Sequence, residues 1–407
     1  MTKTYRKVID TLYNNRDIMV EQLHLFCDIN SGTTNLPGLA QMANALQTAY
    51  KPIADEIQIK KLQPLSQINM SGETSLQSCG DVLLIRKRPH LKRRILLSGH
   101  MDTVYSASNP FQKLTYINDN YVNGPGVTDM KGGLIVMLHA LTAFEQTEEA
   151  QHMGWDVLIN SDEEIGSPAS SVLFDEIAAD YQAALVYEPA MTATGTLAKN
   201  RKGSGKLTLI ATGKAAHAGR AFDEGRNAIC YLAEAICAVH ALNGQRDGVT
   251  INVGKIAGGE ALNVVPDKAI AKLDVRISLP EDEHWVRNEL KHIIGSLKRP
   301  DYFLSIQGDF GRPVKRVCSG TERLFQRVQS LGKELGLAID WKDSGGCCDG
   351  NNLAHHGLPV LDTLGVRGGH IHSSEEYILL DSLPERAALS ALLLIDLARD
   401  GLEDLKK

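Results

Sequence analysis

Two adjacent glutamates, Glu163 and Glu164, lie on a short loop after a mostly apolar run, residues 155–159. The run is typical of a buried strand, and Ser167-Pro168 predicts the start of a helix that extends to about residue 181. The loop therefore follows the carboxyl end of a strand, where open α/β sheets place their ligands. Adjacent carboxylates repel each other and resist joint burial, so an enclosed pair implies a metal ion or a partner base. By itself, the pair is more typical of a solvated acidic loop.

Histidine and carboxylate residues follow four other apolar or glycine-rich segments in a similar way. His100 and Asp102 come directly after one expected buried strand, and Glu188 ends another. Asp129 lies in a glycine-rich loop before a helix, and His372 follows a second glycine-rich stretch. If the sheet is parallel, these loops converge on one edge. This is the pattern that a metal site makes when the fold gathers its ligands.

The chemistry of this residue set suits divalent metal ions. Two imidazoles and three carboxylates favour Zn²⁺, with Co²⁺ or Mn²⁺ as substitutes. The five expected ligands are His100, Asp129, Glu164, Glu188 and His372. Five ligands exceed the three of a single catalytic site, so we expect two ions that share one bridging carboxylate. Asp129 is the expected bridge because glycines on both sides let the backbone approach closely.

Two carboxylates remain outside this ligand set. Asp102, two residues after His100, is expected to hold the second imidazole nitrogen of that histidine. Glu163 has no metal to bind, and a free carboxylate beside a metal site is what a general base for hydrolysis requires. We therefore expect Glu163 to take a proton from water and to return it to the departing amine.

Length and composition limit the class of protein. At 407 residues and 43% hydrophobic content, the chain can bury a large core, and its length favours two domains. A formal net charge of -6 without a basic block argues against a nucleic-acid partner. No apolar run approaches the length of a membrane span, so no membrane partner is expected. Seven cysteines at irregular spacings give no disulfide framework, and no apolar signal core follows the N-terminus, so a cytoplasmic location is expected.

The elements that position these residues are of two kinds. Before residue 200 and again after residue 312, strands alternate with helices, which predicts an α/β catalytic domain with a mainly parallel sheet flanked by helices. Between these positions the strands alternate polar and apolar residues, and their order with two helices is β-α-β-β-α-β. This order predicts a ferredoxin-like α+β domain. We therefore expect a catalytic domain formed by residues 1–199 and 313–407, with a second domain inserted at 200–312.

Five motifs resemble, in order, those of the M20 metallopeptidase family. They are Ser98–Val104, Gly124–Gly133, Ser161–Ser167, Glu188-Pro189 and His372-Ser373. Gly-Pro-Gly before Asp129 is similar to the glutamate carboxypeptidase (carboxypeptidase G2-like) branch. The resemblance implies a zinc-exopeptidase-like catalytic domain in which His100 and Glu188 hold one zinc ion. Glu164 and His372 would hold the other, with Asp129 as the bridge. The resemblance also implies a cis peptide bond after Asp129.

The inserted segment resembles the lid and dimerisation domain of the same family. The matching segments are Gly213–Gly219, Gly225–Ile229, Asn263–Pro266 and Asp274–Arg276. From its neighbours alone, His217 is more typical of a structural residue. The resemblance implies instead a homodimer in which His217 reaches the active site of the partner subunit and stabilises an oxyanion. It also implies that Arg276 and Asn263 bind the carboxylate end of the substrate, a role that suits the planar guanidinium group.

These features predict a di-zinc hydrolase that cleaves an amide bond next to a free carboxylate. A glutamate carboxypeptidase-type exopeptidase acting on a small peptide is expected first. The alternative is an N-acyl-amino-acid deacylase of the acetylornithine deacetylase, desuccinylase or aminoacylase type, which needs the same ions and the same carboxylate clamp. A non-catalytic binding protein is disfavoured because the base and all five ligands are present. A nucleotide-binding Rossmann enzyme is disfavoured because no GxGxxG turn follows a strand.

Overall fold

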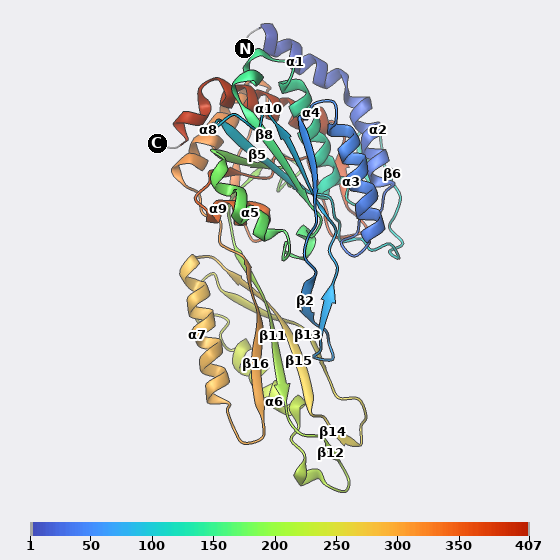
Figure 1. Cartoon of the computed structure of the whole chain (residues 1–407), viewed down its shortest axis with the longest axis vertical. Helices are drawn as coiled ribbons and strands as arrows, with labels where there is room; N and C mark the ends of the chain where they lie inside the picture. Colours follow the sequence, from blue (N-terminus) through green and yellow to red (C-terminus); the bar gives the residue numbers. More distant parts are fainter. Residues whose placement is uncertain (1–2, 406–407) are drawn as a thin grey trace.

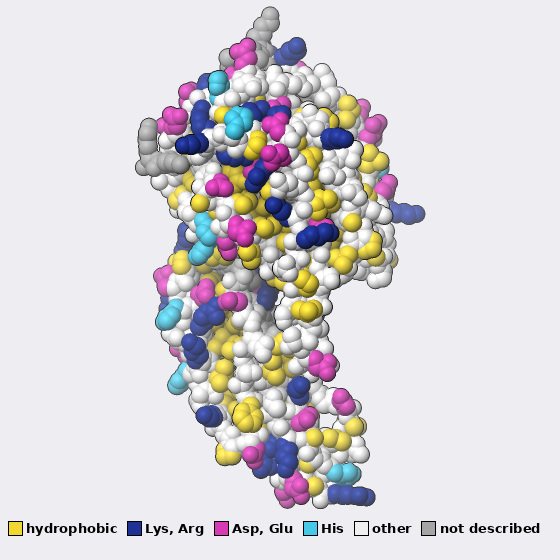
Figure 2. Space-filling model, viewed as in Figure 1, with side chains coloured by type: hydrophobic (Ala, Val, Ile, Leu, Met, Phe, Trp, Pro, Cys, Tyr) yellow, Lys and Arg dark blue, Asp and Glu magenta, His cyan; other side chains and the backbone are white. Residues whose placement is uncertain are grey.

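The computed structural model describes residues 3–405, which form two lobes. Figure 1 shows a larger lobe of sheet and helices that contains both ends of the chain, and a smaller, elongated lobe formed by its middle. The chain enters the smaller lobe through β11 (Gly203–Thr212) and leaves it through β16 (Phe303–Arg312). In the space-filling view the two lobes meet at a narrower waist (Figure 2). The smaller lobe is therefore an insertion in the larger one.

A six-stranded sheet forms the centre of the larger lobe. Its strand order is β1-β4-β8-β5-β9-β18, and the four strands β8, β5, β9 and β18 run parallel. Strand β4 runs antiparallel to both of its neighbours. The expectation of a mainly parallel sheet is therefore confirmed, with one reversed strand. The strands are β1 (Glu56–Lys60), β4 (Val82–Lys87), β5 (Arg94–His100), β8 (Gly154–Asn160), β9 (Ala183–Val186) and β18 (Val360–Leu361).

Helices cover both faces of this sheet. Successive side chains along a strand point to opposite faces, so in β4 Leu83 and Ile85 pack with one helical layer, whereas Val82 and Leu84 pack with the other. The first layer contains α1 (Lys3–Asn14), α2 (Arg16–Cys27), α3 (Leu36–Tyr50), α4 (Gly132–Phe144), α8 (Ser319–Glu334) and α10 (Ser382–Asp396). The second contains α5 (Ser171–Ile177) and α9 (Asp349–His355). A last short helix, α11, spans Leu402–Asp404.

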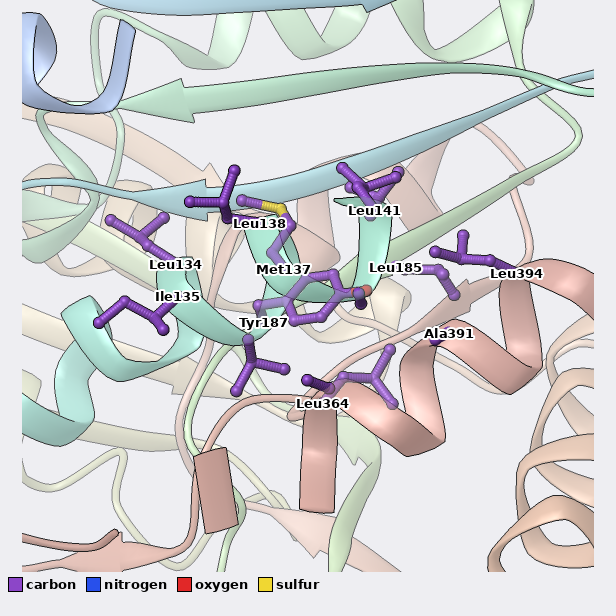
Figure 3. Close-up of a cluster of buried hydrophobic side chains, with 14 of the residues drawn as sticks. Leu134, Ile135, Met137, Leu138, Leu141, Leu185, Tyr187, Leu364, Ala391 and Leu394 are labelled. Atoms are coloured by element: carbon purple, nitrogen blue, oxygen red, sulfur yellow. The ribbon is translucent and has the colours of Figure 1, made fainter. Parts of the chain in front are cut away.

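Helix α4 crosses the centre of the first layer and is apolar nearly all round. Figure 3 shows Met137 and Leu141 of this helix clustered with Tyr187 and with Leu394 of α10. Within residues 3–405, one stretch, Val127–Phe144, is long and apolar enough to cross a membrane by length and composition. This corrects the expectation that no run reaches such a length. The same stretch is 89% buried inside the protein, as the core helix of a folded domain is.

The smaller lobe contains a four-stranded antiparallel sheet in the order β13-β15-β11-β16. Two helices pack against it in a separate hydrophobic cluster that includes Leu209 of the sheet, Leu232 and Val286. The chain order β11-α6-β13-β15-α7-β16 is the expected β-α-β-β-α-β order, so the ferredoxin-like fold is confirmed. The remaining elements are α6 (Ala228–His240), β13 (Thr250–Gly258), β15 (Lys268–Ile277) and α7 (Pro280–Ser296).

Smaller groups of strands complete the structure. A four-stranded sheet has the order β19-β20-β7-β6, and β10 pairs with β17, β12 with β14, and β2 with β3. The β2–β3 hairpin extends from the larger lobe toward the smaller one (Figure 1). The strands are β2 (Leu65–Ile68), β3 (Thr74–Gln77), β6 (Thr115–Tyr116), β7 (Tyr121–Asn123), β10 (Leu197–Arg201), β12 (Ala216–His217), β14 (Val264–Val265), β17 (Trp341–Ser344), β19 (Gly368–Gly369) and β20 (Tyr377–Leu379).

The helix expected to begin at Pro168 is shorter than the sequence indicates. It begins at Ser171, and a short 3₁₀ turn follows it. Ser167 adopts a positive φ of 51° and donates its hydroxyl hydrogen to Asp349, so it does not cap a helix. The prediction of a helix start at Ser167-Pro168 was therefore wrong, because a contact distant in sequence determines the conformation of this serine.

We propose that the inserted domain comprises residues 200–312 and the catalytic domain residues 1–199 and 313–407. The separate hydrophobic clusters of the two lobes support these boundaries. The bounds of β11 and β16 support them as well, because these strands carry the chain between the lobes.

Candidate metal centre

Three expected site segments lie at the carboxyl ends of neighbouring parallel strands. His100 is the last residue of β5, Glu163 and Glu164 follow β8, and Glu188 follows β9. In the sheet, β5 lies between β8 and β9. All three strands are buried along their whole length. The loops that follow them begin at the carboxyl edge of the sheet. The topology thus brings these side chains to one edge, as the sequence predicted.

Asp129 lies between two imidazoles, one at each carboxylate oxygen. Its Oδ1 is 3.1 Å from Nε2 of His100, and its Oδ2 is 3.3 Å from Nε2 of His372. Gly126, just before the turn that carries Asp129, has a φ of 70°, and a Cβ atom there would collide with Thr103. The Asp129–Met130 peptide bond is cis, as the resemblance implied. A carboxylate that faces two imidazoles through different oxygens is placed as a bridging ligand would be.

Glu164 and Glu188 complete the two sides of this arrangement. Oε2 of Glu164 is 3.1 Å from Nε2 of His372, and Oε1 of Glu188 is 3.8 Å from Nε2 of His100. Donor atoms of His100, Asp129 and Glu164 lie within 4.8 Å of one another. The structure therefore brings all five expected ligands together. His100 and Glu188 lie on one side of Asp129, and His372 and Glu164 lie on the other.

His372 comes from outside the central sheet, from the turn between β19 and β20. Its φ is 63°, a left-handed conformation that few non-glycine residues adopt and that is often found at functional sites. Its side chain is 52% exposed, whereas that of His100 is buried. The cluster is therefore open to solvent on the side of His372, as a site that binds a substrate must be.

Asp102 contacts both His100 and the Glu163-Glu164 loop. Nδ1 of His100 is 3.0 Å from the backbone carbonyl oxygen of Asp102 and 3.4 Å from its carboxylate. The carboxylate accepts hydrogen bonds from the backbone N–H groups of Glu163 and Glu164, both at 3.2 Å, and from the hydroxyl of Thr33 at 2.7 Å. Residue 102 therefore orients the imidazole chiefly through its backbone, and its side chain fixes the loop that carries the two glutamates.

Glu163 lies in the cluster but has a partner of its own. Its Oε1 accepts a hydrogen bond from Nη2 of Arg312 at 2.8 Å, and its donor atom lies within 4.8 Å of those of His100 and Glu188. Burial raises the pKa of Glu163 to about 7, although the positive charges of Arg312 and His100 oppose the shift. A carboxyl group with a pKa near neutrality is able both to accept and to donate a proton at neutral pH.

Arg312 is a site residue that the sequence analysis missed. It ends β16, where the chain leaves the smaller lobe, and is 149 positions from Glu163. Its buried guanidinium also donates to Asp349, Asn352 and Ser167. Burial opposes its charge, but the carboxylates of Asp349 and Glu163 outweigh this effect and raise its pKa. An arginine at a strand end is usually a surface residue, so only its place at the expected domain boundary marked it in the sequence.

Two of the three residues expected to act on the substrate, His217 and Asn263, lie away from this cluster in the single chain. His217 is the last residue of β12, which pairs with β14, and Figure 1 shows both strands at the far tip of the smaller lobe. The backbone of Asn263 accepts a hydrogen bond from Ala218, so Asn263 is a neighbour of His217. Arg276, near the end of β15, lies 3.3 Å through Nη1 from Sγ of Cys347. The roles of these residues stay predictions.

The residues of the cluster fit divalent metal ions. Its donors are imidazole nitrogens and carboxylate oxygens, the set that zinc and similar ions bind. Oε1 of Glu164 is buried and has no hydrogen-bond partner in the part of the chain that the structure describes. Buried polar atoms nearly always have one. Several carboxylates enclosed together also require positive charge, and a metal ion would supply both the charge and the missing partner.

Comparison with known proteins identifies relatives over most of the chain. Residues 96–396 match the family described as peptidase family M20/M25/M40. Carboxypeptidase G2 of Pseudomonas sp. (strain RS-16) is 28% identical over 387 residues, which cover 93% of this chain and 89% of that protein. Succinyl-diaminopimelate desuccinylase of Corynebacterium glutamicum is also 28% identical, over 358 residues that cover 83% of this chain and 89% of that protein.

Solved structures show the same fold at lower identity. An M20 family metallo-carboxypeptidase from Sulfolobus solfataricus superposes with a TM-score of 0.72 at 16% identity, over 98% of this chain and 100% of that one. A tripeptidase from Staphylococcus aureus superposes with a TM-score of 0.72 at 21% identity, over 95% of this chain and 99% of that one. The family match, the relatives and the cluster of metal-binding side chains agree with the resemblance seen in the sequence. The chain belongs to peptidase family M20/M25/M40 and is a metal-dependent hydrolase.

Proposed function

We propose that the chain is a di-zinc amidohydrolase that cleaves an amide bond next to a free carboxylate, as a glutamate carboxypeptidase-type exopeptidase does. The observation that carries this proposal is the position of Asp129 between His100 and His372, with Glu163 beside them. An Asp129 carboxylate shared by two ions and a separate base at Glu163 would together meet the needs of hydrolysis with two metal ions. The similarity to carboxypeptidase G2 supports the exopeptidase activity.

Two zinc ions per subunit are proposed, with Co²⁺ or Mn²⁺ as substitutes. His100 and Glu188 would hold one ion, Glu164 and His372 the other, and Asp129 would bind both. When bound, such ions polarise a carbonyl oxygen and make water more acidic. The orphaned Oε1 of Glu164 and the placement of the two imidazoles at different oxygens of Asp129 support this assignment.

Glu163 is proposed to move the proton during hydrolysis. Arg312 occupies Oε1 of this carboxylate, which leaves Oε2 to take a proton from the attacking water. The same carboxyl group then gives the proton to the amide nitrogen, so that the bond between carbonyl carbon and nitrogen breaks and the amine departs. Asp102 keeps the glutamate loop in place through the N–H groups of Glu163 and Glu164.

The smaller lobe is proposed to supply the substrate contacts. Arg276 and Asn263 would bind the free carboxylate of the substrate, and His217 would stabilise the oxyanion that forms on the attacked carbonyl. His217 lies at the far tip of the lobe in its own chain, so it would act in the site of a partner subunit in a homodimer. The edge strands β13 and β16 of the inserted sheet provide an edge along which two copies can pair.

Replacing Arg276 by alanine is expected to raise KM for the substrate by about 10- to 100-fold with a smaller effect on kcat, because a charged hydrogen bond to the substrate carboxylate is lost. Steady-state kinetics on N-acyl-glutamate and dipeptide substrates measure both constants. Arg287→Ala is the matched control, since Arg287 lies on α7 in an exposed ion pair with Glu283. An unchanged KM in Arg276→Ala would remove Arg276 from the proposed carboxylate site.

An N-acyl-amino-acid deacylase is the second candidate, because the chain is also 28% identical to the desuccinylase, over 83% of its own length. Both activities need the same metal ligands and the same base, so the site does not separate them. The test is a panel of dipeptides ending in glutamate, together with N-acetyl and N-succinyl amino acids, assayed with the zinc-loaded protein. Preference for the peptides supports the exopeptidase, and preference for the acyl amino acids replaces it by the deacylase.

A cytoplasmic location is proposed as well. All seven cysteines are free thiols, including the adjacent Cys347 and Cys348. Free thiols persist in a reducing compartment, where disulfides are rare.

The metal-free protein is expected to lose stability as the pH rises. Burial raises the pKa of Glu163 to about 7 and that of Glu164 to about 8, above the ordinary glutamate value of 4.5. Below 4.5 both the folded and the unfolded chain hold these protons, so this stability is fully present. Between pH 4.5 and these raised values, the unfolded chain has given up protons that the folded chain still holds. The free energy of unfolding therefore falls as the pH rises from about 4.5 to about 8.

Thermal unfolding of the chelated protein between pH 5 and pH 8 measures this effect as a falling Tm. The metal-loaded protein is expected to show the opposite trend over the same interval, because metal binding requires deprotonated ligands. The double variant Glu163→Gln, Glu164→Gln is the control and should flatten the slope of the chelated protein. A chelated wild-type protein whose Tm increases toward pH 8 would contradict the assignment.

A further inference from the structure

Glu376 is a buried carboxylate that no step of the proposed reaction uses. It lies four residues after His372, at the end of the turn between β19 and β20, and its relative exposure is 0%. It forms no salt bridge with a lysine or arginine in the part of the chain that the structure describes. A buried carboxylate without a cationic partner is rare. Other groups must therefore stabilise Glu376 in the interior.

Four donors saturate this carboxylate. Oε1 accepts the backbone N–H groups of Thr128 at 2.9 Å and Asp129 at 3.0 Å. Oε2 accepts the backbone N–H of Gly126 at 3.1 Å and the hydroxyl of Tyr105 at 2.7 Å. An ionised carboxylate has about four lone-pair sites, so none is left to coordinate a metal ion or to move a proton. Glu376 therefore acts through the backbone groups that it holds.

Those backbone groups belong to the turn that carries Asp129. Gly126 is in the left-handed conformation, and its N–H points with those of Thr128 and Asp129 at one anion, as in backbone nests that bind anions. The main chain of Glu376 contacts the same segment, because its carbonyl oxygen accepts the backbone N–H of Gly124 at 3.1 Å and the side-chain amide of Asn123 at 2.7 Å. Glu376 thus joins the loop of His372 to the loop of Asp129.

We propose that Glu376 is the positioning residue that fixes Asp129 relative to His372, and thereby sets the affinity of the centre for its metal ions. This inference rests on the proposed metal centre. Glu376 is not itself a metal ligand. It fixes the position of the bridging carboxylate of Asp129 relative to the imidazole of His372, which comes from a separate segment. Residues that orient metal ligands in this way typically change metal affinity or activity by about 10- to 100-fold when replaced.

Glu376→Gln tests the proposal with the least change in shape. The amide keeps one acceptor oxygen but puts an N–H donor against the donors of the turn, so the turn of Asp129 must shift. Titration of the metal-free protein with Co²⁺, followed by its visible absorption, is expected to show an affinity about 10- to 100-fold below the wild type and an altered spectrum. The lost activity should return when the metal concentration is raised by the same factor, with KM unchanged.

Glu375→Gln is the matched control. Glu375 is the preceding residue, and its side chain is 77% exposed and pairs with His370, so this variant should bind Co²⁺ as the wild type does. Tyr105→Phe removes a single donor and keeps the carboxylate, and it should lower Co²⁺ affinity in the same direction by a smaller factor. If Glu376→Gln does not fold, the Co²⁺ affinity of Tyr105→Phe tests the proposal in its place.

Co²⁺ affinity and spectrum equal to the wild type in Glu376→Gln, or in Tyr105→Phe where the first variant does not fold, would overturn the inference. A fall in Tm alone, with unchanged Co²⁺ binding, would also overturn it, because it would show a purely structural role. Failure of the wild-type protein to bind Co²⁺ would instead remove the proposed metal centre itself, and so the two failures are distinguishable.

Discussion

Replacement of Glu163 by glutamine is expected to lower kcat by about 10³-fold or more, while the protein keeps its metal content. General acid–base groups typically contribute about 10²- to 10⁴-fold each, and Glu163 is proposed to act first as base and then as acid. Glutamine has nearly the same shape and can still accept the hydrogen bond from Arg312 that the glutamate accepts at 2.8 Å. The loss should therefore appear in kcat, with little change in folding or in KM.

The neighbouring residue provides the contrast for this experiment. Glu164→Gln should also lower activity, but through loss of metal, because Oε2 of Glu164 faces His372 and its Oε1 has no other partner among residues 3–405. Metal content by atomic emission, measured beside kcat, separates the two variants. Normal turnover by Glu163→Gln would refute the proposed base, and loss of metal from that variant would reassign Glu163 as a ligand.

The sequence predicted most of the residues of this cluster, because several of them follow buried strands that appear in the sequence as apolar runs. His100 and Glu188 each come at or just after an apolar run, and those runs proved to be neighbouring parallel strands β5 and β9. Asp129 was found by its glycines, which allow the turn at Gly126 with a φ of 70°. The ferredoxin-like lobe was predicted for a related reason, since one-sided strands alternate polar and apolar residues.

Residues whose role depends on distant contacts could not be predicted. Arg312 contacts Glu163 across 149 positions and ends a strand of the other lobe, so its place at the expected domain boundary is the single sign of it in the sequence. Glu376 had no role that the sequence could indicate, because the backbone N–H groups that donate to it lie about 250 residues earlier in the chain. Ser167 was read as a helix cap from its proline neighbour, but Asp349 binds its hydroxyl instead. Local sequence patterns indicate which segments form helices, strands and turns. These long-range contacts form only when the lobes and loops pack together, so no local pattern indicates them.

Removal of metal is expected to abolish turnover, and reloading with Zn²⁺, Co²⁺ or Mn²⁺ to restore it, with two ions bound per chain at full activity. The reason is geometric: Asp129 faces His100 through one oxygen and His372 through the other, so one side chain serves two positions. Dialysis against a chelator, followed by titration with metal and parallel assay of activity, measures the stoichiometry.

Single ligand variants test the sharing of Asp129 more sharply than total metal content does. His100→Ala and His372→Ala should each retain one ion, because each removes a ligand from a different side of the pair. Asp129→Ala should weaken both positions at once and lower metal content toward zero, since its carboxylate is the contact that the two sides have in common. Equal loss from all three variants would indicate a single ion, and an Asp129→Ala protein with two ions bound would show that the carboxylate is not a bridge. A shared ligand therefore predicts that the most damaging substitution lies at Asp129, which faces the two imidazoles through both of its oxygens, rather than at Glu188 or Glu164.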